Sequence, residues 1–197
     1  MNRLILFIQC IRFLPHIVAY FLFPGRVRPD LPHWMEVITS PFPNSQFLAY
    51  CWYCVHLPEY RTLLYHRLGR MSCVLRLFAQ PMPTCFLTGM LSRDIAPGLI
   101  IQHGHSMRLG ASRVGRNLQI WHNVTVAKER PGGQRPIIGD NVRIYTGSVV
   151  LGGITIGNNV VIGACTVVLK SVPDNCLVVG NPARIVKRNG VRCDEKL

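Results

Sequence analysis

The C-terminal half of the chain places an aliphatic residue at every sixth position, and this spacing limits the possible folds more than any other feature. The aliphatic positions in this phase are Ile138, Ile144, Val150, Ile156, Ile162 and Val168. The residue four positions after each is small or β-branched: Val142, Ser148, Ile154, Val160, Thr166 and Val172. A period of six matches neither the period of 2 of a β-strand nor the period of 3.6 of an α-helix. It predicts a coil with three short, flat sides.

The same phase continues toward the N-terminus with one interruption and one slip. Further aliphatic positions are Val126, Ile120 and Val114 and, after a slip of one residue, Met107, Ile101 and Ile95. The intervening segment 127–137 is polar and rich in Gly and Pro, which predicts a loop that leaves a corner of the coil and returns in register. Gly139, Gly157 and Gly163 directly follow aliphatic positions, where a sharp bend leaves no space for a Cβ. The repeats therefore extend from about residue 95 to residue 179.

The first half of the chain has a helical pattern between Pro-rich breaks. Residues 58–68 begin with a proline at a plausible first turn and place Leu64, Arg67 and Leu68 three or four positions apart. The stretch 4–23 is strongly apolar, but Gln9, Arg12, Pro15 and His16 interrupt it, which argues against a membrane-spanning helix. Gln9, Arg12 and His16 share one helical face. Two interpretations remain open: a helix docked on its own domain or a partner subunit, and peripheral membrane contact through 4–23.

Charge and cysteine content exclude several classes of protein. The formal net charge is +13, and 18 of the 22 basic residues are Arg, which indicates an anionic partner. These residues are scattered without basic runs, so we expect no nucleic-acid binding. The eight cysteines form no disulfide framework, and Cys51 and Cys54 make a single C-x-x-C that is insufficient for a metal. We therefore expect free thiols and a cytoplasmic location, with association with the inner face of the membrane left open.

Two segments add a family resemblance to the repeats. They are GGQRPIIG at 132–139, which closes the loop, and VPDNCLVVGNPARIV at 172–186. With the repeats, they resemble the hexapeptide-repeat acyltransferases, and among these the serine O-acetyltransferase type, including its polysaccharide-modifying variants. The resemblance implies a mainly β protein: an α-helical leader (1–87), a left-handed parallel β-helix (88–186) with the loop 127–137, and a C-terminal tail (187–197). It also implies a homotrimer that binds acetyl-CoA between neighbouring β-helices and needs no metal.

The resemblance assigns the general base to His103. A hydroxyl is a poor nucleophile at neutral pH, and a positioned imidazole removes its proton as it attacks the thioester. Two positions depart from the serine acetyltransferase pattern. An Asp that stands 15 residues before the catalytic His is replaced here by Thr88, and a second His in the loop is replaced by Arg135, which is still suited to binding a substrate carboxylate. These changes leave a sugar hydroxyl open as acceptor beside serine.

The spacing of the repeats offers a replacement for the missing Asp. His103 and His122 both follow an aliphatic position by two residues and are one coil apart, so we expect them to stack. We propose that His122 orients His103, with a purely structural role for His122 as the alternative. Asp140 either continues this column or, as we favour, is a turn residue in Gly139-Asp140-Asn141. The resemblance further assigns CoA contacts to Thr146 and Ala164 for the pantetheine arm, and to Lys170 and Arg184 for the phosphates.

The expected activity is thus an acetyl-CoA-dependent O-acetyltransferase acting on serine or, alternatively, on a saccharide. A non-catalytic trimeric β-helix scaffold is a further alternative, and it would fail to bind CoA. A γ-type carbonic anhydrase has the same coil but needs three zinc-binding His at a spacing that His103, His105 and His122 do not provide.

Overall fold

The computed structural model describes residues 11–81, 85–87 and 94–197. The chain divides into two compact units, residues 1–83 and 84–197. The sequence-based boundary lay between residues 87 and 88, a few residues beyond this division. Thr88 lies outside the described residues.

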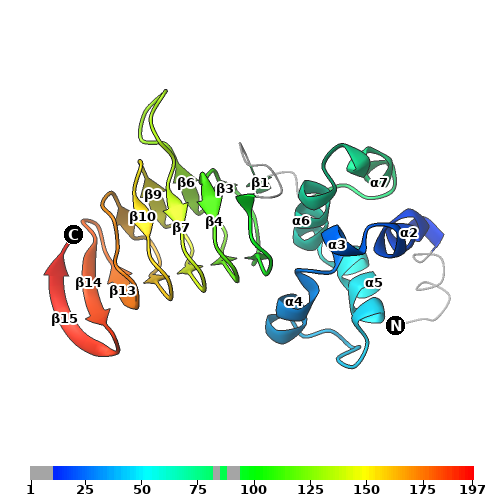
Figure 1. The fold of residues 1–197 in the computed structure, drawn as a ribbon, viewed down its shortest axis with the longest axis horizontal. Helices are drawn as coiled ribbons and strands as arrows, with labels where there is room; N and C mark the ends of the chain where they lie inside the picture. The colour runs from blue at the N-terminus through cyan, green and yellow to red at the C-terminus, as the bar shows by residue number, and fades with distance from the viewer. Residues whose placement is uncertain (1–10, 82–84, 88–93) are drawn as a thin grey trace. The chain divides into compact units, whose positions relative to one another are not determined.

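The first unit is helical (Figure 1). Its elements are α2 (Leu14–Leu22), α3 (Pro24–Val27), α4 (Leu31–Val37), α5 (Gln46–His56), α6 (Pro58–Leu68), the 3₁₀ turn η1 (Gly69–Met71) and α7 (Ser72–Phe78). Prolines in the first turn of α2, α3, α4 and α6 favour helix starts, because the ring fixes φ and the missing N–H would have no helical partner there. At the start of α5, Ser45 Oγ accepts a hydrogen bond from the amide of Leu48 at 3.3 Å.

Buried aromatic side chains form the core of the helical unit. Trp34, Tyr50, Tyr53, Tyr60 and Tyr65 are all at most 2% exposed. Three of the tyrosine hydroxyls donate to backbone carbonyls: Tyr50 to His16 at 2.7 Å, Tyr53 to Ile38 at 2.8 Å and Tyr65 to Ala79 at 2.7 Å. Such pairing removes the penalty of burying a hydroxyl, so large rings with polar ends fill this core.

A buried ion pair also joins helices that are distant in sequence. Arg67 donates to both carboxylate oxygens of Asp30, each at 2.9 Å. Two parallel hydrogen bonds of this kind fix the geometry of both side chains and compensate for the loss of water around the charges.

The helix α2 has an unexpected orientation. His16 is fully buried, and its Nε2 lies 2.7 Å from the hydroxyl of Tyr65. The sequence pattern placed His16 on a polar face with Arg12 and Gln9; Arg12 is exposed, and Gln9 lies outside the described residues. The His16 side therefore faces the core, and Leu14, Val18, Phe21 and Leu22 face outward. Within the described ranges, no helix is long and apolar enough to cross a membrane.

The second unit is a coil of short parallel strands (Figure 1). Its strands are β1 (Cys85–Leu87), β2 (Ile100–Ile101), β3 (Met107–Leu109), β4 (Arg113–Val114), β5 (Gln119–Ile120), β6 (Thr125–Ala127), β7 (Ile137–Ile138), β8 (Arg143–Ile144), β9 (Val149–Leu151), β10 (Thr155–Ile156), β11 (Val161–Ile162), β12 (Val167–Val168), β13 (Cys176–Val179), β14 (Arg184–Arg188) and β15 (Val191–Lys196). They form a five-stranded sheet β1-β3-β6-β9-β12, a three-stranded sheet β10-β7-β4 and a seven-stranded sheet β15-β14-β13-β11-β8-β5-β2. The predicted class, an α-helical region followed by a left-handed parallel β-helix, is confirmed.

The strand register explains the period of six. In the seven-stranded sheet Ile101, Ile120, Ile144 and Ile162 are paired one above the other, and all are at most 2% exposed. Each side of the coil thus contributes one buried aliphatic side chain to a continuous stack. The loop between β6 and β7 leaves the coil and returns without breaking this register, because Ile138 pairs with both Val114 and Ile156.

One corner of the coil carries a ladder of asparagines. Asn117, Asn141, Asn159 and Asn175 have φ angles of 58°, 56°, 54° and 59°. The side-chain amide of each of the first three donates to the side-chain oxygen of the next, at 3.0, 3.1 and 2.9 Å. Asn tolerates a left-handed backbone better than most residues, and the amide chain links consecutive coils.

The C-terminal end departs from the parallel pattern. Strand β14 runs antiparallel to β13, and β15 runs antiparallel to β14. The segment 187–197, predicted as a tail, therefore supplies the end of β14 and all of β15.

We predict that Asn141→Ala lowers the free energy of unfolding by about 1–3 kcal/mol, because it combines left-handed strain with the loss of two side-chain hydrogen bonds. Asn141→Gly, which adopts the same φ without strain, should lose less. Denaturant unfolding of both variants measures the difference, and equal losses would contradict a contribution from strain.

A second prediction concerns pH. Burial, with a smaller contribution from nearby Arg61, lowers the pKa of His16 from 6.5 to about 4. Below pH 6.5 the His16 imidazole becomes protonated in the unfolded chain but stays neutral in the folded chain. The free energy of unfolding therefore falls as the pH decreases toward 4, by up to roughly 3 kcal/mol. A His16→Gln variant should lack this component. Chemical unfolding at pH 7 and pH 4.5 tests it, and an unchanged pH dependence in the variant would contradict the assignment.

Candidate functional site

A column of four residues lines the corner that follows the seven-stranded sheet. His103, His122, Thr146 and Ala164 each stand two positions after a paired isoleucine of that sheet. Contacts between coils agree with this register, since Thr146 Oγ1 donates to the carbonyl of His122 at 3.1 Å and Cys165 N donates to the carbonyl of Thr146 at 2.9 Å. The structure thus places the two predicted histidines and two predicted CoA contacts on one line.

His103 is the first residue of this column and is exposed. It has a φ of 50°, an uncommon backbone conformation for a histidine, and the carbonyl of His103 accepts from the amide of His105 at 2.6 Å. The centroids of the His103 and His122 rings are 6.4 Å apart, with an angle of 62° between the rings. An exposed imidazole beside a second imidazole is a suitable site for proton transfer with a bound hydroxyl.

His122 is more enclosed than His103. Its Nδ1 is buried and has no hydrogen-bond partner in the part of the chain that the structure describes. A buried nitrogen without a partner costs about 1–3 kcal/mol, so such groups in native proteins call for an explanation.

Asp140 has the favoured turn role and does not continue the histidine column. Ile138, two residues before it, pairs with Val114 and Ile156 in the three-stranded sheet, so Asp140 lies at a different corner from His122. Its Oδ1 accepts from the amide of Arg116 at 2.7 Å, which is a turn-forming role. The loop lengthens this coil, and the residue that follows His122 in the column is Thr146, 24 positions later.

Two aromatic rings that were not predicted from the sequence lie beside the column. Trp121 and Tyr145 are partly exposed and stack at 4.3 Å between centroids, with 23° between the rings. Each directly precedes a column residue, His122 or Thr146. The same coil position holds Gln102 in the preceding coil and Gly163 in the following one. Two aromatic residues at a position that is not aromatic in the neighbouring coils were the sequence feature that could have indicated this pair.

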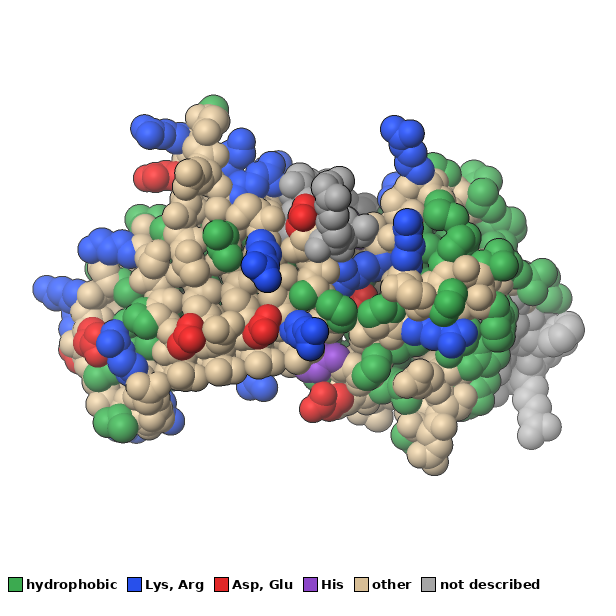
Figure 2. Space-filling model, in the orientation of Figure 1, with side chains coloured by type: hydrophobic (Ala, Val, Ile, Leu, Met, Phe, Trp, Pro, Cys, Tyr) green, Lys and Arg blue, Asp and Glu red, His purple; other side chains and the backbone are tan. Residues whose placement is uncertain are grey.

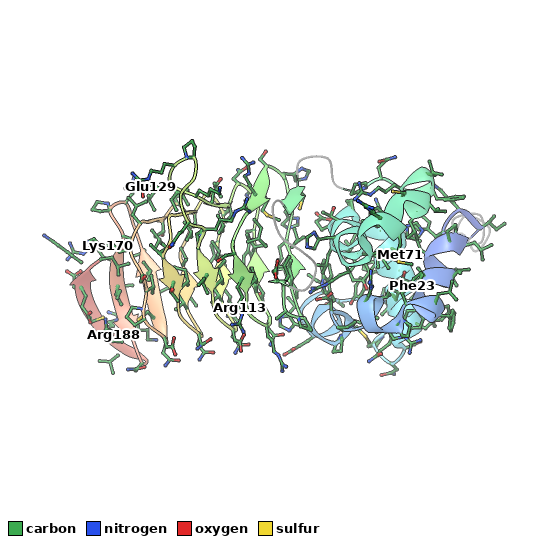
Figure 3. All side chains as sticks on the ribbon, turned by 45° about the horizontal axis from the view of Figure 1, so that its top comes forward. Phe23, Met71, Arg113, Glu129, Lys170 and Arg188 are labelled. Carbon is green, nitrogen blue, oxygen red and sulfur yellow. The ribbon has the colours of Figure 1, made fainter. Side chains whose placement is uncertain are left out.

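Arg135 lines a basic cavity at the next corner. The cavity has a volume of about 340 Å³ and is lined by Arg108, Gly110, Ala127, Lys128, Glu129, Arg130, Pro131 and Arg135. Gly110 follows β3 and Ala127 ends β6, so this corner follows the five-stranded sheet. Figure 3 shows Glu129 on the loop that leaves the coil here. Within one chain, the structure therefore places Arg135 and the histidine column at different corners.

The two predicted phosphate-binding cations also lie apart. Lys170 is exposed and follows β12 of the five-stranded sheet, whereas Arg184 lies on β14 of the seven-stranded sheet. Arg184 already forms an ion pair with Asp194 of β15, with a nitrogen–oxygen distance of 2.5 Å. Among the described residues, no group of three or more His, Cys, Asp or Glu side chains is arranged to hold a metal ion.

Comparison with known proteins agrees with this geometry. Residues 135–170 match the family model "Bacterial transferase hexapeptide (six repeats)". The serine acetyltransferase of Staphylococcus xylosus is 47% identical over 119 residues, which cover 55% of this chain and 53% of that protein. The repeat region of the chain is thus similar to bacterial hexapeptide transferases and to serine acetyltransferases.

Solved structures extend this likeness to the fold. A serine acetyltransferase from Brucella abortus strain S19 has a TM-score of 0.64 at 25% identity, covering 91% of this chain and 75% of that one. The Neisseria gonorrhoeae serine acetyltransferase in complex with serine has a TM-score of 0.58 at 25% identity, covering 88% and 72%. The chain spans about half the length of the curated relatives that it matches.

Proposed function

We propose that this serine acetyltransferase-like chain transfers the acetyl group of acetyl-CoA to a hydroxyl, with serine as the first candidate acceptor. The observation that carries the proposal is the exposed His103 ring, 6.4 Å from the His122 ring, on a hexapeptide-repeat coil. Similarity to serine acetyltransferases over the repeats supports both the reaction and the acceptor.

In the proposed reaction His103 acts as general base. Its imidazole takes the hydroxyl proton while the oxygen attacks the thioester carbonyl of acetyl-CoA. The C–S bond then breaks, and the leaving CoA sulfur takes up the proton held by His103, which returns to its neutral form. The products are the O-acetyl ester and free CoA, and no acetyl group is attached to the enzyme.

His122 acts as a positioning residue for this base. Its ring lies beside that of His103, at the coil position that follows it in the register. A neighbouring imidazole restricts the orientation of the base and thereby favours the geometry in which the proton is removed.

The residues that continue the column are suited to binding the acetyl-CoA donor. Thr146 and Ala164 are small, so an extended pantetheine arm can approach the backbone of successive coils beyond the histidines. Lys170 and Arg184 follow near the C-terminal end as candidates for its phosphates. The net charge of +13 also favours a polyanionic ligand.

A homotrimer would bring the histidine column of one chain close to the Arg135 cavity of another. One chain holds the histidine column and the Arg135 cavity at different corners of a rigid coil. A neighbouring copy can supply the second part, so that each acetyl-CoA is bound between two subunits. The free thiols of the described cysteines favour a reducing compartment, and we infer a cytoplasmic location.

A saccharide hydroxyl is the second candidate acceptor. The stacked Trp121 and Tyr145 rings adjoin the histidine column, and aromatic faces are well suited to the apolar face of a sugar ring. Arg135, which stands where serine acetyltransferases have a second loop histidine, adds a cation that can also bind an acidic acceptor.

An acceptor screen tests the reaction directly. We predict that purified full chain releases free CoA thiol from acetyl-CoA in the presence of serine or of a member of a sugar panel. His103→Ala should lower kcat by about 10² to 10⁴ while CoA affinity stays nearly constant, because general-base catalysis acts in the transition state. His105→Ala is the matched control. Failure to bind CoA would support the scaffold alternative.

The two histidines should behave as one unit. We expect His122→Ala to lower kcat by about 10-fold to 100-fold, less than His103→Ala, because it misorients the base without removing it. The double variant should be scarcely slower than His103→Ala, since no base remains to be positioned. Steady-state kinetics of the three variants provide the measurement, and additive losses would show that His122 acts independently.

A further inference from the structure

The helix α2 exposes its apolar side chains and buries its histidine. His16 is 0% exposed, whereas Leu22 is 64% and Leu14 is 56% exposed. A helix that only closes a domain core would turn its leucines inward and its imidazole toward water. Several outward apolar side chains on one helix favour contact with an apolar partner.

A second helix extends this surface. The helix α7 packs against α2 and exposes Val74, at 58%, and Leu77, at 81%. Between α2 and α7 lies an apolar groove of about 570 Å³, lined by Leu14, Pro15, Val18, Ala19, Leu22, Phe23, Met71, Val74 and Leu75. Figure 2 shows hydrophobic side chains gathered over this part of the helical unit, and Figure 3 shows Phe23 and Met71 beside one another. We call this surface the α2–α7 face.

Only positive charges accompany the α2–α7 face. The segments 11–29 and 69–81, which contain α2, α3, η1 and α7, have no Asp or Glu and carry Arg12, Arg26, Arg28, Arg70 and Arg76. Four of these arginines are exposed, and Arg28 is partly exposed. Arg26 Nη1 contacts Met71 Sδ at 3.9 Å, so a guanidinium lies at the rim of the groove. Apolar side chains bordered by cations match the acyl chains and phosphates of anionic lipids.

We propose that the α2–α7 face binds the surface of an anionic lipid membrane, with α2 and α7 lying in the plane of the interface. Leu14, Val18, Leu22 and Val74 enter the boundary between headgroups and acyl chains, and the flanking arginines bind lipid phosphates. The helices α2 and α7 are too short to cross the bilayer.

Charge favours a membrane over a second copy of the chain. Two α2–α7 faces in contact would bring two sets of arginines together with no carboxylate from the segments that form them. Anionic headgroups neutralise the same arginines. The proposal does not depend on acetyl transfer, because it concerns the helical unit alone.

Vesicle co-sedimentation of the full chain, without acetyl-CoA, tests the proposal. We expect binding to vesicles that contain phosphatidylglycerol and weak binding to pure phosphatidylcholine. The double variant Arg26→Gln, Arg70→Gln should bind the anionic vesicles about 10- to 30-fold more weakly. The double variant Leu22→Asp, Val74→Asp should lose at least about 10-fold, because charges replace side chains that would enter the lipid.

Leu48→Asp is the matched control for the apolar variant. Leu48 is 43% exposed on α5 and does not line the groove, so this variant should bind vesicles like the unmodified chain. Circular dichroism establishes that each variant is folded. Equal binding to neutral and anionic vesicles, or no binding to either, would overturn the proposal. A lower molecular mass of the Leu22→Asp, Val74→Asp variant in light scattering, without a change in vesicle binding, would instead assign the face to a contact between copies.

Discussion

The stacking of one buried aliphatic side chain per coil side determines the rest of the β unit. Ile101, Ile120, Ile144 and Ile162 are paired in register, and a shift of one residue would move each of these side chains out of the interior. The backbone of every coil is therefore held at a fixed height and rotation. Residues at equal distances from these isoleucines must then form columns on the outside of the coil. The histidine column is a direct consequence of this register.

The same constraint explains which parts of the site could be predicted. The spacing of His103 and His122 from Ile101 and Ile120 was sufficient to predict that they are neighbours. The possible column position of Asp140 was wrong because the number of residues in the loop cannot be divided between coil and excursion from the sequence alone. Trp121 and Tyr145 were missed because outward positions carry no periodic requirement, and their stacking depends on side-chain conformations. The roles of Arg135, Lys170 and Arg184 stay predictions, since each depends on a ligand or a second chain.

The helical unit was less predictable for a different reason. Helical periodicity in α2 separates two faces but does not indicate which of them packs against the domain. His16 is accommodated in the core because Tyr65 provides a hydrogen-bond partner for its ring, and Tyr50 donates to its carbonyl at 2.7 Å. Neither tyrosine is near His16 in the sequence. The outward direction of Leu14, Val18 and Leu22 follows from these tertiary contacts rather than from the amphipathic pattern.

Rigidity of the coil also limits how the proposed site can be completed. The histidine column and the Arg135 cavity are separated by the strands of the five-stranded sheet, including β3 and β6. Those strands are locked by hydrogen bonds to the coils on both sides, so no hinge within the coil can bring the two corners together. Completion of the site by movement of a single chain is therefore unfavourable. Association of identical chains needs no such deformation, because a symmetric arrangement can place the cavity corner of one copy beside the histidine corner of the next, and a closed ring repeats that contact at every interface.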